Sequence, residues 1–268
     1  MLAVMLVGAG LVVVDAVHQA QPAASVLGAP VAPSGSPEMS TPALWPGFGP
    51  GSAPGSPPWP ATGPSATASG GATETEVSVV QRGTGQFAYA TGTSPIAGRA
   101  GELRRYRVAV EGGTGVDPER FGVAVETVLA DPRGWTAGGQ VRLQRVPGNA
   151  PAEFTVYLAS PVTSEQMCRA GWLETQQFTN CRLGGQVVIN LARWLTAVPD
   201  YGAPLATYQA YAINHEVGHE LGQGHELCPG LGRLAPVMQQ QTLGLRGCVA
   251  NSWPYLDGVR YTGPPVDG

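Results

Sequence analysis

The pattern of apolar and polar residues predicts that folded structure begins near Thr75. Short runs of apolar and β-branched residues, bounded by turn residues, are typical of strands that are buried on at least one face. The sequence predicts such strands at 77–81, 103–110, 140–146, 154–159 and 186–190.

Helices are predicted at three places between and after these strands. Asp117 and Pro118 mark a helix start, because aspartate accepts hydrogen bonds from free backbone N–H groups and proline fits the first helical position. That helix is expected to run to about Ala130, and a shorter one is expected at 162–168. A long third helix is expected to start near Pro204. The order of these elements predicts an α+β fold, with a twisted mixed sheet and two main helices.

The first 72 residues differ in composition from the rest of the chain. Residues 1–14 are apolar, but they are fewer than the roughly 20 residues that a membrane span needs. They fit the apolar part of a signal peptide better, although no basic residue precedes them and no clear cleavage site follows. We therefore predict a signal peptide or membrane anchor at 1–20. Residues 21–72, rich in Pro, Gly, Ser and Ala, are predicted to be a disordered linker.

Length and charge limit the number of domains and the kind of partner. The remaining segment, 73–268, is long enough for one sizeable domain, which we expect to be a monomer. Its basic residues form no stripe, and the net charge of the whole chain is only −4. A nucleic acid partner is therefore not expected.

Three of the four histidines lie in one segment, 215–225, which reads H-E-x-x-H-x-x-G-x-x-H. Residues four apart share a face of a helix, so His215 and His219 can direct ring nitrogens to one point. Gly222 can adopt a positive φ and end the helix, which allows His225 to return as a third ligand. Three neutral imidazoles with one open position form the ligand set of a catalytic zinc ion, Zn2+. The alternative is an exposed helix with solvated histidines, but it does not explain the third histidine.

This motif resembles that of the metzincin metallopeptidases. The resemblance implies a zincin-like domain with a cleft below the edge strand of the sheet, and a short C-terminal subdomain because only residues 239–268 follow Met238. It also implies that Met238 lies in a turn and forms an apolar floor under the ligands. The alternative for Met238 is an ordinary core position. Many metzincins carry a tyrosine shortly after this methionine, whereas glutamines follow it here.

A longer part of the chain, from about Thr73 to Asp257, is similar to a family of uncharacterised actinobacterial proteins that carry the same histidine motif. The similarity includes the segments 188–194, 238–242 and 251–255. Members are secreted or membrane-anchored. The similarity therefore implies that this protein is secreted or anchored to the outer face of the cytoplasmic membrane.

The cysteines are expected to form disulfides, because their number is even and an exported domain lies in an oxidising environment. They are Cys168, Cys181, Cys228 and Cys248, and they lack the spacing of a zinc ribbon. Of the three connectivities, we favour Cys168–Cys181 and Cys228–Cys248. Four reduced thiols would fit only a protein that is not exported.

The functional hypothesis is an extracytoplasmic zinc-dependent endopeptidase. Zinc held by His215, His219 and His225 would lower the pKa of a bound water towards about 7. Glu216 would accept the proton of that water as general base and pass it to the leaving amine. The substrate, a peptide or protein, is expected to add a strand to an edge strand at 186–190.

Two other functions fit the same motif. One is a non-catalytic zinc-binding interaction module tethered at the cell surface, which the presence of Glu216 disfavours. The other is a peptidase restricted to cell-wall peptides.

Five further side chains are considered for roles near the site. Glu226 resembles a glutamate of the astacin group that lies in a buried hydrogen-bonded network; the alternatives are an exposed charge or a partner of His225. Arg193 is weighed as the partner of an acidic group near the cleft, and Tyr211 as a core residue beside the site. Tyr255 and Tyr261 are the weakest candidates, for stabilising an oxyanion.

Overall fold

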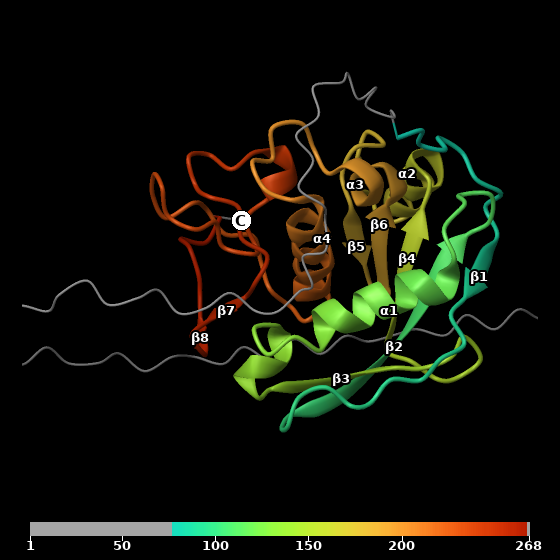
Figure 1. Ribbon diagram of the computed structural model, residues 1–268, viewed down its shortest axis with the longest axis horizontal. Helices are drawn as coiled ribbons and strands as arrows, with labels where there is room; N and C mark the ends of the chain where they lie inside the picture. Colours follow the sequence, from blue (N-terminus) through green and yellow to red (C-terminus); the bar gives the residue numbers. More distant parts are fainter. Residues whose placement is uncertain (1–76, 267–268) are drawn as a thin grey trace, which may run out of the picture. The chain divides into compact units, whose positions relative to one another are not determined.

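The computed structural model of the protein describes residues 77–266 (Figure 1). The predicted leader at 1–20 and linker at 21–72 lie outside the described residues. Within the described part, no helix is both long and apolar enough to cross a membrane. The fold is α+β, as the order of apolar patterns predicts.

A six-stranded mixed sheet forms the centre of the fold (Figure 1). Its strands are β1 (Phe87–Tyr89), β2 (Glu102–Glu111), β3 (Val141–Arg145), β4 (Phe154–Ala159), β5 (Cys181–Leu183) and β6 (Gln186–Asn190). Their order is β1-β2-β4-β6-β5, and β3 pairs with the first half of β2. The strands β2, β3, β4 and β6 are parallel, whereas β1 and β5 run antiparallel to their neighbours.

Two predictions about strands are wrong. Residues 77–81 form no strand: within the described part of the chain no strand pairs with them, and Gln81 O accepts a hydrogen bond from Val162 N at the start of a helix. Residues 186–190 form β6 as predicted, but β6 is not at the edge of the sheet. The turn at Gly184-Gly185, with Gly185 at φ 74°, folds β5 back onto β6 as a hairpin. The edge strand is therefore β5.

The helices surround this sheet. They are α1 (Pro118–Leu129), α2 (Pro161–Arg169), α3 (Leu191–Thr196) and α4 (Leu205–Glu220), with short 3-10 turns η1 (Trp135–Gly138) and η2 (Gln241–Leu243). A small hairpin, β7 (Tyr255–Leu256) and β8 (Val259–Arg260), follows near the C-terminal end. The Asp117 carboxylate accepts a hydrogen bond of 2.8 Å from Arg120 N, which confirms the predicted start of α1.

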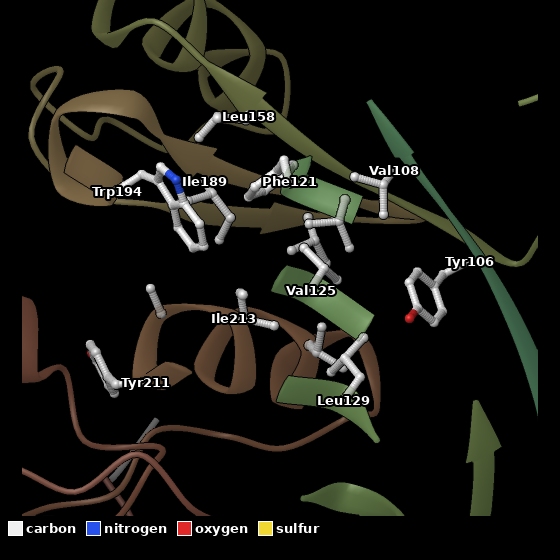
Figure 2. Close-up of a cluster of buried hydrophobic side chains, with 14 of the residues drawn as sticks. Tyr106, Val108, Phe121, Val125, Leu129, Leu158, Ile189, Trp194, Tyr211 and Ile213 are labelled. Carbon is white, nitrogen blue, oxygen red and sulfur yellow. The ribbon is translucent and has the colours of Figure 1, made fainter. Parts of the chain in front are cut away.

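The two long helices, α1 and α4, pack against one face of the sheet and against each other. Figure 2 shows Phe121 and Val125 of α1 beside Ile213 of α4 and Ile189 of β6. Alternate residues of a strand point to opposite faces, so Val188 packs on the other side, near α2. The helix α4 is buried over most of its surface, and this fixes the helix that carries the histidine motif.

Both predicted disulfides are present. Cys168–Cys181 joins the end of α2 to β5, and Cys228–Cys248 joins the segment after His225 to the segment after Met238. Disulfides are typical of proteins that fold outside the reducing cytosol.

Candidate metal centre

The helix α4 ends at the glycine of the histidine motif. Gly222 has φ 85°, a conformation that residues with a Cβ rarely adopt. Its N–H donates to His219 O at 3.0 Å, and Gln223 N donates to Gly218 O at 2.9 Å. These two bonds form a Schellman motif, which ends the helix and reverses the chain. The reversal brings His225 back towards α4.

The three histidines of the motif converge on one point. The ligand atoms that they offer all lie within 4.8 Å of one another. The Nε2 atom of His219 lies 3.2 Å from Nε2 of His215 and 3.0 Å from Nε2 of His225. The structure therefore brings together all three residues that the sequence selects as ligands.

Backbone carbonyls fix the tautomers of two of these rings. His215 Nδ1 lies 2.8 Å from Val237 O, and His219 Nδ1 lies 2.9 Å from Gln223 O. A carbonyl oxygen only accepts, so each Nδ1 must carry the proton and donate it. In the neutral rings, each of the two Nε2 atoms then carries a lone pair and no proton. The distance of 3.2 Å between Nε2 of His215 and Nε2 of His219 is therefore not a hydrogen bond.

The donor set fits a zinc ion. Two lone pairs that face each other repel, unless a cation lies between them. Ligand nitrogens about 2.0–2.1 Å from a tetrahedral zinc ion are roughly 3.3 Å apart, close to the separations found here. Histidine rings whose Nδ1 donates to a carbonyl are typical of zinc ligands, because this bond orients the ring.

Burial keeps the rings neutral. His215 is 5% exposed, and burial, with the nearby His219, lowers the pKa of His215 to about 3. Burial also lowers the pKa of His219 and of His225. Neutral imidazoles can act as metal ligands without first losing a proton.

Glu216 lies beside the histidines and does not belong to the converging set. It is also 5% exposed, and burial raises the pKa of its carboxyl to about 8. A cation nearby would oppose this shift and favour the carboxylate.

A cleft of about 720 Å³ opens over the histidines and Glu216. One wall is formed by residues 173–182, which lead into and include the start of the edge strand β5. Another part of its lining comes from residues 240, 242 and 243 of the segment after Met238. At the rim, Arg182 Nε lies 2.6 Å from Glu220 Oε2 in an ion pair that the sequence pattern did not indicate.

Met238 lies in a turn closed by the hydrogen bond from Gln239 N to Pro236 O, 3.0 Å. It is fully buried and faces Gly218 of α4: a Cβ at position 218 would lie 2.4 Å from its sulfur. Its neighbour Val237 orients His215. Met238 is thus a buried apolar residue that packs against the helix carrying two of the histidines.

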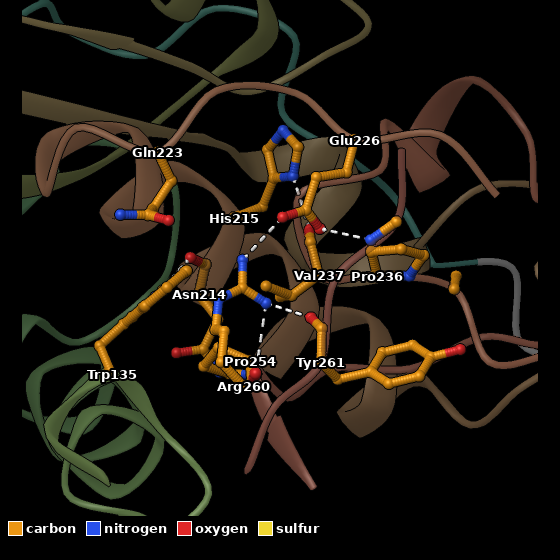
Figure 3. A network of polar contacts seen from close by, with 12 residues as sticks. Trp135, Asn214, His215, Gln223, Glu226, Pro236, Val237, Pro254, Arg260 and Tyr261 are labelled. Carbon is orange, nitrogen blue, oxygen red and sulfur yellow. Dashed lines mark hydrogen bonds and ion pairs between the residues drawn. The ribbon is translucent and has the colours of Figure 1, made fainter. Parts of the chain in front are cut away.

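A polar network includes Glu226, the residue that follows the third histidine (Figure 3). The carboxylate of Glu226 forms an ion pair of 3.0 Å with Arg260 and accepts a longer bond from Gly263 N. The guanidinium of Arg260 also lies 5.0 Å from the ring centroid of Trp135. Trp135 Nε1 in turn donates to the backbone oxygen of Asn214 at 2.9 Å. Glu226 is therefore part of a network and not a freely exposed charge.

The other expected neighbours have different outcomes. Tyr211 packs beside the site, with its ring centroid 5.3 Å from that of His215 and its hydroxyl donating to Gln239 O. Tyr255 and Tyr261 do not line the cleft. The acidic partner weighed for Arg193 is not found: its guanidinium lies 4.4 Å from the ring centroid of Phe178, and among residues 77–266 it forms no ion pair.

Several residues of the site were not predicted from the sequence. Arg260 is distant in sequence and has no recognisable motif around it. One sequence feature could have indicated the cleft wall between Cys168 and Cys181: apolar residues lie inside a loop that a local disulfide would close.

Comparison of the chain with curated proteins and with solved structures gave no match. A family model matches residues 73–253, which include the sheet, α1 to α4, the three histidines and Met238. This match covers more than half of the chain, and the protein therefore belongs to the family described as protein of unknown function (DUF3152).

Proposed function

We propose that the protein is a zinc-dependent endopeptidase with a zincin-like fold, acting outside the cytoplasm. The observation that carries the proposal is the convergence of three neutral imidazoles, two with fixed tautomers, beside the buried acid Glu216 in an open cleft. The two disulfides support a location outside the reducing cytosol.

His215, His219 and His225 would hold the metal. When bound, zinc would supply a Lewis acid and lower the pKa of a water at its open position to about 7. Glu216 would accept a proton from the attacking water and deliver it to the nitrogen of the leaving amine. Its buried position keeps it out of bulk water, and a cation held by the histidines would favour its charged, proton-accepting form.

The edge strand β5 would orient the substrate. Residues 181–183 pair with β6 on one side, and β5 ends the order of the sheet on the other. An extended peptide could pair with this edge in the cleft wall and place its backbone across the histidines.

The test is metal content and peptide hydrolysis by purified protein, wild type beside Glu216→Gln. We expect one equivalent of zinc in both proteins and cleavage by the wild type alone. Zinc in both with cleavage in neither would favour a binding module. Cleavage of cell-wall peptides and of no other substrate would favour a cell-wall peptidase. Full activity of zinc-loaded Glu216→Gln would contradict the role of Glu216, and absence of metal from both would contradict the site itself.

A further inference from the structure

The loop between α2 and β5, residues 170–180, presents large apolar side chains to solvent. Trp172 is 94% exposed, Leu173 41% and Phe178 37%. Exposed apolar side chains that gather on one loop are typical of a binding surface. The disulfide Cys168–Cys181 closes the loop at its base.

The loop is held in one shape by hydrogen bonds to Glu165 and Asn190. The carboxylate of Glu165 in α2 accepts from Thr175 N at 3.0 Å and Gln177 N at 3.1 Å, and also from the Thr175 hydroxyl. From β6, Asn190 Nδ2 donates to Gln177 O at 2.8 Å, and Asn190 N donates to Asn180 Oδ1 at 2.9 Å.

This shape includes unfavourable backbone conformations. Trp172, Gln176 and Gln177 have positive φ, although none is glycine. Such conformations persist only where surrounding contacts hold them, and they gather at functional sites. The loop is therefore ordered by its contacts even though apolar side chains stay uncovered.

Two of the apolar side chains line the cleft that contains the histidines. Leu173 and Phe178 are on the wall formed by the loop, and Leu243 lines the same cleft from the segment after Met238. The Arg193 guanidinium, 4.4 Å from the Phe178 ring centroid, supports the ring in place.

Charged groups lining the same cleft are largely paired. Arg182 is paired with Glu220, and Glu174 lies 3.6 Å from Arg169. The wall of the cleft formed by the loop thus offers a substrate apolar contacts and few unpaired charges. Apart from Glu216 beside the histidines, the charged groups that a substrate side chain would meet there are already paired, so burying a charged side chain on this wall would cost hydration with little return.

We propose that Leu173, Phe178 and Leu243 determine specificity: they select peptides that carry a large apolar side chain close to the scissile bond. This inference rests on the proposed peptidase function. Because the loop is ordered by Glu165, Asn190 and the disulfide, little conformational entropy is lost when a substrate side chain packs on it.

The experiment measures binding separately from hydrolysis. Fluorescent peptides identical except for one central residue (Leu, Phe, Ala or Asp) are titrated into full-length Glu216→Gln, loaded with zinc, and followed by fluorescence anisotropy. We expect the Leu and Phe peptides to bind at least about tenfold more tightly than the Ala and Asp peptides. Adding Phe178→Ala or Leu173→Ala should reduce this preference. Val123→Ala, which removes an exposed apolar side chain from α1 outside the cleft, should leave it unchanged.

Circular dichroism of each variant separates loss of binding from loss of folding. The same peptides, given in competition to wild type, test the preference through kcat/KM without any substitution at Glu216. Equal binding of all four peptides, or a preference that both loop variants retain, overturns the inference. Apolar-selective binding without any hydrolysis by wild type supports the apolar selectivity of the cleft and contradicts the peptidase function. Hydrolysis without apolar preference supports the peptidase function and contradicts the apolar selectivity of the cleft.

Discussion

Nη2 of Arg260 lies 3.0 Å from Oε1 of Glu226, the residue directly after the third histidine. The segment that contains Arg260 also holds the histidine segment through its backbone: Val266 N donates to His225 O at 3.1 Å, and Leu227 N donates to Pro264 O at 2.7 Å. Residues 260–266 thus support the loop that positions His225, although they lie beyond the part matched by the family model.

Arg260→Met is expected to weaken zinc binding by less than the roughly 10- to 100-fold typical of losing a group bonded directly to a metal ligand, because Arg260 acts through Glu226 and the segment that carries His225. The substitution leaves the half-buried carboxylate of Glu226 without its cation, so the segment that carries His225 should shift. Competition with a chromophoric chelator measures the affinity. Arg233→Met, at an exposed arginine of the same half of the domain, is the matched control. Equal zinc affinity of Arg260→Met and wild type would contradict this role.

Gly218→Ala is expected to lower the free energy of unfolding by up to about 2 kcal/mol. Overpacking a core costs about 1–3 kcal/mol, offset by roughly 1 kcal/mol because alanine favours the helix. The added Cβ would lie 2.4 Å from the Met238 sulfur and 2.6 Å from Cζ2 of Trp135. Urea unfolding measures the change. Gly184→Ala is the control, because a Cβ there meets nothing within 4 Å. A Gly218→Ala protein as stable as wild type would show that this contact is loose.

The sequence predicts those features that depend on neighbours along the chain. The spacing of His215 and His219 on one helical face, and the turn at Gly222, are local properties and are found as predicted. The start of α1 at Asp117 has the same origin, since a capping side chain acts within one turn. The local disulfide pairs could be favoured because short loops connect them.

Features that depend on distant segments were not predictable. The order of strands places β5 outside β6, although β6 has the stronger apolar pattern, because the edge is decided by the hairpin and the disulfide and not by hydrophobicity. Residues 77–81 look like a strand but find no neighbouring strand. The pairing of Arg260 with Glu226 joins positions 34 residues apart and leaves no periodic signal.

The two disulfides should have separable effects. Removing either, as Cys168→Ser with Cys181→Ser or Cys228→Ser with Cys248→Ser, is expected to lower the free energy of unfolding by about 3 kcal/mol, since each closes a short loop. Loss of Cys168–Cys181 should also weaken the apolar preference of the cleft, and loss of Cys228–Cys248 should weaken zinc binding. Each variant is therefore the control of the other in peptide-binding and chelator-competition measurements. Identical effects of both pairs on both properties would contradict these separate roles.

The buried carboxylate of Glu111 should make part of the stability depend on pH. Burial alone would raise the pKa of this carboxyl, but hydrogen bonds from Thr163, Ser160 and Gly85 outweigh it and hold the pKa below the ordinary value of 4.5. A pKa that is lower in the folded state means that the stabilisation is present above about pH 4.5 and is lost as the pH falls through the folded value.

Glu111→Gln is therefore expected to destabilise the protein by roughly 2 kcal/mol at pH 7, the usual contribution of hydrogen bonds to a buried charged group. The difference from wild type should be smaller at pH 3.5, because below about pH 4.5 the unfolded wild type binds a proton at Glu111 more readily than the folded wild type does, which removes part of the stabilisation. Urea unfolding of both proteins at the two pH values measures this difference. Thr163→Val removes the donor that lies 2.7 Å from Oε1 of Glu111. The free energy of unfolding of this variant should therefore change less between the two pH values than that of wild type. A difference between wild type and Glu111→Gln that stays constant from pH 7 to pH 3.5 would show that the carboxylate charge does not stabilise the fold.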